Sequence, residues 1–164
     1  CETWEFVGSV EMMSRQGDLI NRDKNEFDVA YRTVSKNSDE WFSAGYFNFS
    51  TELLPDTFNI KQLLKKRNET QPIGLPSCGS VFKNPPQDFA ARLIEASGLK
   101  GHCIGGACVS DKHANFIINN GQASASDIEN LIAEVRQQVK QKFGVSLYTE
   151  VRIIGDHLAE VTDV

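Results

Sequence analysis

Hydrophobic and polar residues alternate in short runs along the first 50 residues of the chain. The clearest runs cover residues 4–7, 26–31 and 41–49, and the last is rich in aromatic side chains. Alternation over runs of this length is typical of β-strands that bury one face. Gln16-Gly17-Asp18 predicts a turn between two strands. The sequence therefore predicts a β-rich first region.

A short helix and a boundary are predicted after this region. Pro55-Asp56 ends the β-rich part, and the basic run Lys65-Lys66-Arg67 suits the C-terminal turn of a helix, where cations are favoured. The apolar positions of this helix are Phe58, Ile60, Leu63 and Leu64. Pro72 and Pro76 cannot continue a helix, because proline lacks the amide donor. We expect a domain boundary near residues 68–76.

The remainder of the chain alternates helical and strand-like patterns, which predicts an α/β region. Residues 89–97 form a helical stripe closed by Gly98, and residues 114–118 form a compact apolar strand ended by Asn120-Gly121. Ser126-Asp127-Ile128-Glu129 fits a capping box that opens a long helix, and Gly144 ends that helix. Its predicted core face consists of Ile128, Leu131, Ile132, Val135, Val139 and Phe143. Residues 147–154 predict a strand with Glu150 and Arg152 on one face.

Composition narrows the functional classes. The chain has 164 residues, 40% hydrophobic and 24% charged, as in ordinary globular proteins. A net charge of −5 argues against broad nucleic-acid binding, and no apolar run is long enough to cross a membrane. Four cysteines, at positions 1, 78, 103 and 108, are few and irregularly spaced for a disulfide scaffold, so reduced thiols are predicted. The spacing Cys103-x4-Cys108 does not suit the common zinc sites, so no metal is expected.

Five short motifs carry the candidate chemistry. They are Tyr31-Arg32, Gly79-Ser80-Val81-Phe82-Lys83-Asn84-Pro85, Ile104-Gly105-Gly106-Ala107, Lys112-His113-Ala114-Asn115-Phe116 and Glu150-Val151-Arg152-Ile153-Ile154-Gly155. In this order and spacing they resemble the UDP-N-acetylenolpyruvoylglucosamine reductase (MurB) family, in the compact form that lacks a long tyrosine-bearing substrate loop. The resemblance extends from about Glu26 to Gly155 and covers the C-terminal part of the family's sequence.

The resemblance implies an α+β fold with a defined domain order. Residues 1–66 would be the tail of a VAO/PCMH-type FAD-binding domain, residues 72–155 an α/β substrate-binding domain, and residues 156–164 a short tail. A chain that opens with strand-like sequence at Cys1 leads us to expect further sequence upstream. The main contacts to FAD would lie there, so this chain alone would be incomplete as an enzyme.

The implied activity is that of a cytoplasmic, FAD-dependent NADPH oxidoreductase. Members of the family reduce UDP-N-acetylglucosamine enolpyruvate to UDP-N-acetylmuramate, as UDP-N-acetylmuramate dehydrogenases of peptidoglycan synthesis. This reaction serves cell-wall biogenesis and, through it, cell shape and cell division. The sequence carries no signal for an oligomeric state.

The resemblance assigns the catalytic set to Arg32, Ser80 and Glu150. Hydride transfer from flavin N5 to the β-carbon of the enolpyruvyl group leaves negative charge on the α-carbon and carboxylate. An arginine suits this charge because its planar guanidinium clamps a carboxylate with two hydrogen bonds. Ser80 would then protonate the α-carbon, and Glu150 would position the protonated system or share its charge.

The remaining site residues are also expectations from the resemblance. The substrate-binding set is Tyr31, Lys83, Asn84, His113 and Asn115. Arg67 would lie by the flavin, although Thr70 replaces a lysine that often follows three positions later in the family. Asn84 has a structural alternative, the opening of the helix after Pro85-Pro86, and His113 could equally be a structural residue.

Two other functions remain as alternatives. One is a non-catalytic fragment that binds a nucleotide-sugar without flavin. The other is a serine hydrolase, which is disfavoured because Cys78-Gly79-Ser80-Val81-Phe82 lacks the second glycine of a nucleophile elbow.

Overall fold

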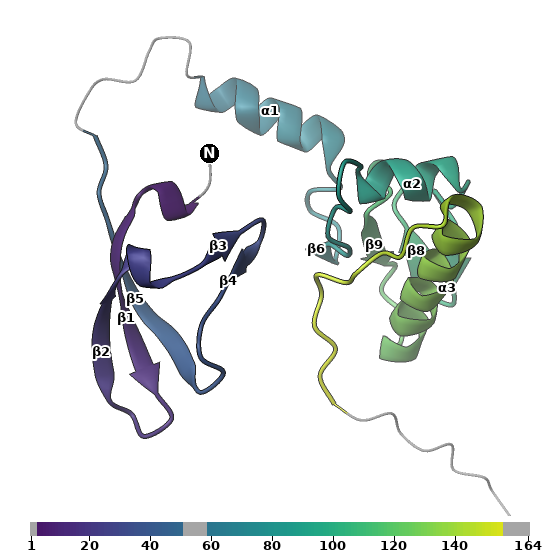
Figure 1. Cartoon of the computed structure of the whole chain (residues 1–164). Helices are drawn as coiled ribbons and strands as arrows, with labels where there is room; N and C mark the ends of the chain where they lie inside the picture. The colour runs from purple at the N-terminus through teal and green to yellow at the C-terminus, as the bar shows by residue number, and fades with distance from the viewer. Residues whose placement is uncertain (1–2, 51–58, 156–164) are drawn as a thin grey trace, which may run out of the picture. The chain divides into compact units, whose positions relative to one another are not determined.

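The protein folds into two compact units, which are described separately (Figure 1). The structure is a computed structural model that describes residues 3–50, in the first unit, and 59–155, in the second. The expectations for Cys1, Pro55-Asp56, Phe58 and the tail 156–164 lie outside the described residues.

The first unit is built on an antiparallel sheet of three strands in the order β2-β1-β5. The strands are β1 (Val7–Ser14), β2 (Leu19–Asp23) and β5 (Glu40–Phe47). Val7, Val10 and Met12 of β1 are buried, and they pack with Phe27. Val7 and Val10 are three residues apart, yet both are buried, because the register with β5 shifts between Val7 and Ser9. Such a bulge restores the inward direction of the side chains after it.

The sequence predicted part of this unit correctly. The aromatic run at 41–49 forms β5, and Gln16-Gly17-Asp18 lies in the turn between β1 and β2. The expected strands at 4–7 and 26–31 are largely wrong. Residues Thr3–Glu5 form the 3-10 turn η1, and only Val29–Ala30 of the second run is a strand, β3, paired with β4 (Thr33–Val34).

A capping box explains why the second of these runs begins as a turn. The Asp23 carboxylate accepts a hydrogen bond from Asn25 N at 2.9 Å, and the Glu26 carboxylate accepts one from Asp23 N at 2.8 Å. These two bonds hold Lys24–Glu26 as the 3-10 turn η2. A strand pattern read from alternation alone does not include this local competition between side chains and backbone.

The second unit packs two helices against a four-stranded sheet (Figure 1). The sheet order is β6-β9-β8-β7, with strands β6 (Ser77–Ser80), β7 (Cys103–Ile104), β8 (Ala107–Val109) and β9 (Phe116–Asn119). The helices are α2 (Ala90–Ala96) and α3 (Ala125–Phe143). Ala107, Val109 and Ile117 of the sheet share one core with Leu93 of α2 and Leu131 of α3.

The pairing of these strands corrects the expected α/β architecture. Helices and strands are mixed, as predicted, but β6, β9, β8 and β7 pair only antiparallel. β7 and β8 are joined by the turn Gly105-Gly106. A connection this short cannot join parallel strands. The arrangement of this unit is therefore α+β.

Helix α1 (Ile60–Thr70) confirms the predicted short helix but lies on the other side of the domain division. The Asn59 side chain caps its start by accepting from Gln62 N at 3.2 Å. Lys112 Nζ donates to the carbonyl of Asn68 in its last turn, which ties α1 to the second unit. The boundary expected near residues 68–76 differs from the structural division, which falls before residue 59.

Helix α3 has the predicted core face and a different cap. Leu131, Ile132, Val135 and Val139 are buried, Ile128 and Phe143 pack at the edge of the core, and Gly144 ends the helix in the left-handed conformation. The capping box predicted at Ser126 and Glu129 is wrong. Ser124 Oγ accepts from Asp127 N at 3.0 Å, and the Asp127 carboxylate accepts from Ser124 N at 2.9 Å.

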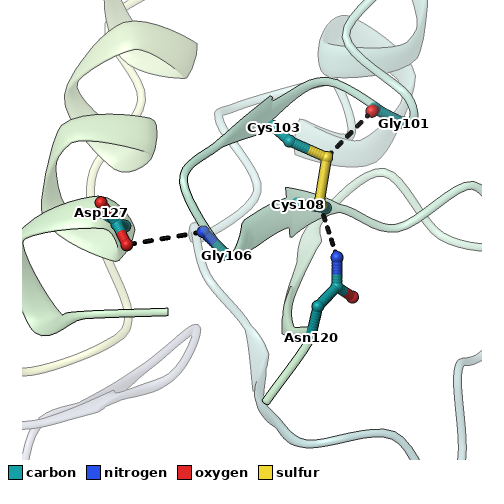
Figure 2. The surroundings of a disulfide bond; sticks show 6 residues. All are labelled: Gly101, Cys103, Gly106, Cys108, Asn120 and Asp127. Atoms are coloured by element: carbon teal, nitrogen blue, oxygen red, sulfur yellow. Dashed lines mark hydrogen bonds between the residues drawn. A yellow bond between two sulfur atoms is a disulfide. The ribbon is translucent and has the colours of Figure 1, made fainter. Parts of the chain in front are cut away.

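A tertiary contact accounts for this choice of cap. Gly106 N lies 3.5 Å from Asp127 Oδ2, so the β7–β8 turn also approaches the capping carboxylate (Figure 2). A Cβ at Gly106 would lie 2.4 Å from Ala123 N, so only glycine allows the β7–β8 turn to lie this close to the residues that precede α3. The bonds to Ser124 lower the pKa of Asp127. The carboxylate is therefore kept in the charged form that accepts these bonds.

The strand predicted at 147–154 is also wrong. Thr149 forms a single bridge to Phe82, and no regular strand follows it up to residue 155. Ile153 and Ile154 are exposed, at 57% and 93%. Their apolar side chains therefore do not pack against a sheet, and alternation alone was misleading here.

Two of the four cysteines correct the prediction of reduced thiols. Cys103 and Cys108 are joined by a disulfide, while Cys78 is free and exposed. The β7–β8 register places Cys103 directly opposite Cys108, which brings the two sulfur atoms together (Figure 2). Sequence spacing did not reveal this hairpin pairing. Asn120 Nδ2 donates to Cys108 Sγ at 3.1 Å.

The start of α3 provides a test of the capping assignment in the full-length protein. Ser124→Ala removes the hydroxyl that accepts from Asp127 N, so it should lower the free energy of unfolding by about 1 kcal/mol. Ser126→Ala is the matched control, because Ser126 is exposed within the first turn, and it should change stability by less than about 0.5 kcal/mol. Urea unfolding followed by circular dichroism measures both. A larger loss for Ser126→Ala would contradict the cap described here.

Candidate active site

The candidate active site is organised by the backbone segment 80–83, which is bonded along both edges. On one edge Ser80 pairs with Phe116 of β9, and Val81 N donates to the Asn115 carbonyl at 2.9 Å. On the other edge Glu150 N donates to the Val81 carbonyl at 2.8 Å, and Lys83 N donates to the Tyr148 carbonyl at 2.9 Å. Ser80 and Glu150, far apart in sequence, are therefore held on neighbouring backbone segments.

Ser80 lies at the end of β6, after a glycine that redirects the chain. Gly79 has a φ of +81°, and the register of β6 with β9 is irregular between Ser77 and Ser80. A side chain at position 79 would be strained at this φ, although nothing lies within 4 Å of a Cβ there. Ser80 and Glu150 are both partly buried. The backbone thus presents a hydroxyl and a carboxylate from two adjacent segments.

Asn84 lies just beyond this segment and has a structural contact. Its Oδ1 accepts a hydrogen bond from Ala90 N at 3.0 Å. Helix α2 has no side-chain hydrogen bond at its N-cap residue Phe89, so Asn84 supplies an acceptor for the first turn from six residues upstream. This bond supports the alternative in which the Asn84 side chain opens the helix. Lys83 is partly buried beside it.

His113 lies half-buried before β9 and packs edge-on against Phe116, with ring centroids 4.8 Å apart. Asn115 N donates to His113 Nδ1 at 3.3 Å, so Nδ1 acts as an acceptor. Burial lowers the pKa of His113. A hydrogen bond with its own backbone opposes this shift in part, Lys100 lowers the pKa further, and Glu95 has a weaker opposing effect. These features favour the neutral imidazole near neutral pH.

Asn115 is buried, at 4% exposure, and both ends of its side chain contact the backbone of Phe82. Nδ2 donates to the Phe82 carbonyl at 2.8 Å, and Oδ1 accepts from Phe82 N at 3.0 Å. The structure therefore places this predicted substrate contact inside the protein, where it supports the 80–83 segment.

Tyr31 and Arg32 belong to the first unit and form the turn of the β3–β4 hairpin. Both side chains are exposed, and the Arg32 guanidinium lies 5.9 Å from the centre of the Tyr31 ring. Arg32 has a φ of +52°, in the left-handed region that non-glycine residues rarely occupy. Backbone strain of this kind is often kept where function requires a particular side chain.

Arg67 is exposed on α1, where its Nε donates to Gln71 Oε1 at 3.3 Å. The structure thus brings Ser80, Lys83, Asn84, His113, Asn115, Arg67 and Glu150 into the second unit and leaves Tyr31 and Arg32 in the first.

Ser110 is a supporting residue that is not among the site residues predicted from the sequence. It is buried, and its hydroxyl accepts from Lys112 N at 3.2 Å and His113 N at 3.3 Å. These bonds shape the turn that presents His113. Ser110-Asp111 between an apolar strand and Lys112-His113 is a turn signal that could have identified it.

A pocket of about 490 Å³ lies beside the disulfide rather than at Ser80. Its lining includes Ile73, Cys103, Cys108, Lys112 and Ile118. Within residues 3–50 and 59–155, no group of three or more His, Cys, Asp or Glu side chains could hold a metal ion. No helix in the same ranges is long and apolar enough to cross a membrane.

Comparison with known proteins decides the family. Residues 71–154 match the family model described as UDP-N-acetylenolpyruvoylglucosamine reductase, C-terminal domain. The chain belongs to the UDP-N-acetylenolpyruvoylglucosamine reductase family. This confirms the resemblance found in the sequence motifs.

Individual relatives agree with this assignment. The chain is 55% identical over 156 residues to the UDP-N-acetylenolpyruvoylglucosamine reductase of Coxiella burnetii (strain Dugway 5J108-111), an alignment that covers 94% of this chain and 49% of the relative. It is 54% identical over 160 residues to that of Methylococcus capsulatus, covering 94% of this chain and 51% of the relative. The chain thus spans about half the length of the curated reductases it matches.

A solved structure is also similar. The crystal structure of UDP-N-acetylenolpyruvylglucosamine reductase (MurB) from Thermus caldophilus matches with a TM-score of 0.69 at 27% identity. The match covers 91% of this chain and 53% of the MurB chain.

The lowered pKa of His113 predicts a pH dependence of stability in this reductase-family protein. Below the unfolded-state pKa of 6.5, the unfolded chain binds the His113 proton more readily than the folded protein does. The contribution of His113 is therefore complete above pH 6.5 and is lost as the pH falls through its lower folded-state pKa. His113→Gln removes this titrating group. The free energy of unfolding should therefore fall less in the variant than in the wild type between roughly pH 7.5 and roughly pH 5.5, a range that includes the ordinary pKa of histidine.

His102→Gln is the control for this measurement, because His102 belongs to the same unit but lies in another environment, with its Nε2 3.0 Å from Glu134. Urea unfolding of the full-length protein at several pH values compares the two variants. An unchanged slope in His113→Gln would contradict the burial argument.

Proposed function

We propose that the protein reduces UDP-N-acetylglucosamine enolpyruvate to UDP-N-acetylmuramate with electrons from NADPH. The observation that carries this proposal is the pairing of segments 80–83 and 148–150 within a chain of this reductase family. Ser80 directly precedes Val81, and the Val81 carbonyl accepts a hydrogen bond from Glu150 N at 2.8 Å. A proton donor and a carboxylate are thereby held on adjacent segments of a hydrogen-bonded scaffold.

Ser80 and Glu150 would carry out the protonation step. Addition of a hydride to the β-carbon of the enolpyruvyl double bond moves the electron pair onto the α-carbon and its carboxylate. The Ser80 hydroxyl then gives its proton to the α-carbon and regains one from solvent, while Glu150 holds the donor in place. In total the double bond gains one hydride and one proton: NADPH gives the hydride equivalent and becomes NADP⁺, and the proton that Ser80 gives is replaced from solvent.

Arg32 would stabilise the charge that develops on the substrate carboxylate. A guanidinium stays protonated and can donate two parallel hydrogen bonds to a carboxylate, which a lysine ammonium cannot do in the same geometry. The left-handed backbone conformation at Arg32 supports this role. Glycine would adopt this conformation with less strain, so the presence of an arginine here suggests that its side chain is needed.

The binding residues follow from their chemistry. We assign Lys83 and Asn84 to binding of the anionic nucleotide-sugar, and Asn84 also caps the first turn of α2. We assign Tyr31 and His113 to further contacts with the substrate. A neutral His113 would bind as a hydrogen-bonding group rather than as a cation.

FAD, when bound, supplies the hydride. The described residues fit it in one respect: Arg67 is an exposed guanidinium on α1, with the donor geometry that suits a diphosphate. We place the first unit in the FAD-binding domain. Several large apolar side chains of its sheet are exposed, such as Trp41, Phe42 and Tyr46, as expected of a surface that packs against more of the protein.

The non-catalytic nucleotide-sugar-binding alternative has less support, since no observation on Arg32, Ser80 or Glu150 favours the loss of activity. The proposed reaction places the enzyme in the cytoplasm, where NADPH and nucleotide-sugars are available, and in peptidoglycan synthesis.

The test is a stopped-flow comparison of the two half-reactions in the full-length protein. Ser80→Ala should slow flavin reoxidation by UDP-N-acetylglucosamine enolpyruvate about a hundredfold, near 3 kcal/mol, because one pre-positioned donor is lost. Flavin reduction by NADPH should change less than about twofold, because Ser80 takes no part in it.

Ser77→Ala provides the matched control on the same strand, because Ser77 is exposed on β6. It should leave both half-reactions unchanged. A full-length protein that carries no flavin but still binds the UDP-sugar would overturn the reductase proposal in favour of the binding alternative.

A further inference from the structure

Asn115 is one of three buried polar or charged residues among those that the structure describes, with Glu40 and Ser110. A buried amide must find partners for both its donor and its acceptor, or its burial costs free energy. Both partners of Asn115 lie on one residue, Phe82. This pair of bonds has the form of a backbone pairing between strands, with a side chain in place of one backbone.

The position of Asn115 explains why a side chain takes this role. β9 begins at Phe116, and Asn115 lies in the turn before it. The Asn115 carbonyl still pairs with Val81 N, but the chain then turns away towards His113. The amide reaches one residue further and satisfies the N–H and C=O of Phe82, which β9 does not pair.

This contact fixes the segment that carries the candidate catalytic groups. Phe82 lies two residues after Ser80 and directly before Lys83, and its side chain is buried in the core at 2% exposure. The opposite edge of the segment bonds to Glu150 N and to the Tyr148 carbonyl. A shift of the Phe82 peptide would therefore move Ser80, Lys83 and the acceptor of Glu150 N together.

We propose that Asn115 is a positioning residue for the protonation step, acting through the Phe82 backbone to keep Ser80 and Glu150 in register. The inference rests on the proposed reductase function. It replaces the expected substrate contact of Asn115, because both polar ends of the amide already bond to Phe82. A displacement of about 1 Å at a reacting group can reduce a rate by roughly a hundredfold, so a residue with this role affects catalysis without contacting substrate.

The experiment uses Asn115→Ala and Asn115→Asp in the full-length, flavin-loaded protein. Asn115→Ala removes both bonds to Phe82, and Asn115→Asp retains an acceptor for Phe82 N but loses the donor to the Phe82 carbonyl. Stopped-flow absorbance follows flavin reduction by NADPH and reoxidation by UDP-N-acetylglucosamine enolpyruvate. Reoxidation should slow by roughly tenfold to a hundredfold, while reduction by NADPH changes less than about twofold.

Val139→Ala controls for lost stability. Val139 is fully buried in α3, in the same core as Phe82, but it makes no contact described at the site. It should lower the melting temperature, because it leaves a cavity in the core, and it should leave both half-reactions unchanged at about 25 °C. The solvent deuterium isotope effect on reoxidation adds a readout that stability does not change: it should increase in both Asn115 variants, because proton transfer from a displaced Ser80 becomes slower.

The outcomes separate the two proposals. Normal reoxidation in a folded Asn115 variant, or an equal loss in Val139→Ala, would overturn the positioning role. If Asn115→Ala does not fold, Asn115→Asp decides by the same criteria, and wild-type reoxidation rates in that variant refute the role. Absence of substrate-dependent reoxidation in the wild-type protein would instead refute the reductase function itself.

Discussion

The structure of the second unit depends on the hydrogen bonds along both edges of residues 80–83. One edge is bonded by β9 and the Asn115 amide, and the other by residues 148–150. Bonds on both sides leave this short segment little freedom, although β6 itself is irregular at Gly79. A segment held in this way can present a hydroxyl at a fixed position, which a flexible loop cannot do as well.

The same unit is held together around the β7–β8 hairpin. The Cys103–Cys108 disulfide closes the hairpin, and its glycine turn approaches Asp127 at the start of α3 (Figure 2). Disulfides are uncommon in reducing compartments, so in such a compartment the state of this pair would follow the thiol–disulfide balance around it. The contacts of Asp127 with Ser124 and Gly106 are hydrogen bonds in which neither cysteine takes part.

The sequence predicted features that depend on local chemistry. The apolar stripe of α3 and its end at Gly144 were correct, because periodicity and a left-handed glycine are local signals. The capping residue was not, because Ser124 and Ser126 both begin a capping pattern and the choice involves a contact with Gly106. The strand expected around Glu150 also failed, since pairing depends on a neighbour that alternation does not reveal. The motifs around Arg32 and Ser80 indicated the family, but the bonds from Asn115 to Phe82 required the fold.

The most direct measurement is a crystal structure of the full-length protein with UDP-N-acetylglucosamine enolpyruvate bound. We expect the Ser80 hydroxyl to lie roughly 3–3.5 Å from the α-carbon of the enolpyruvyl group, and the Arg32 guanidinium to bind the substrate carboxylate. The bonds from Asn115 to Phe82 and from Glu150 to Val81 should be retained. A substrate whose α-carbon lies out of reach of Ser80, or a segment 80–83 released from residues 148–150, would contradict this expectation.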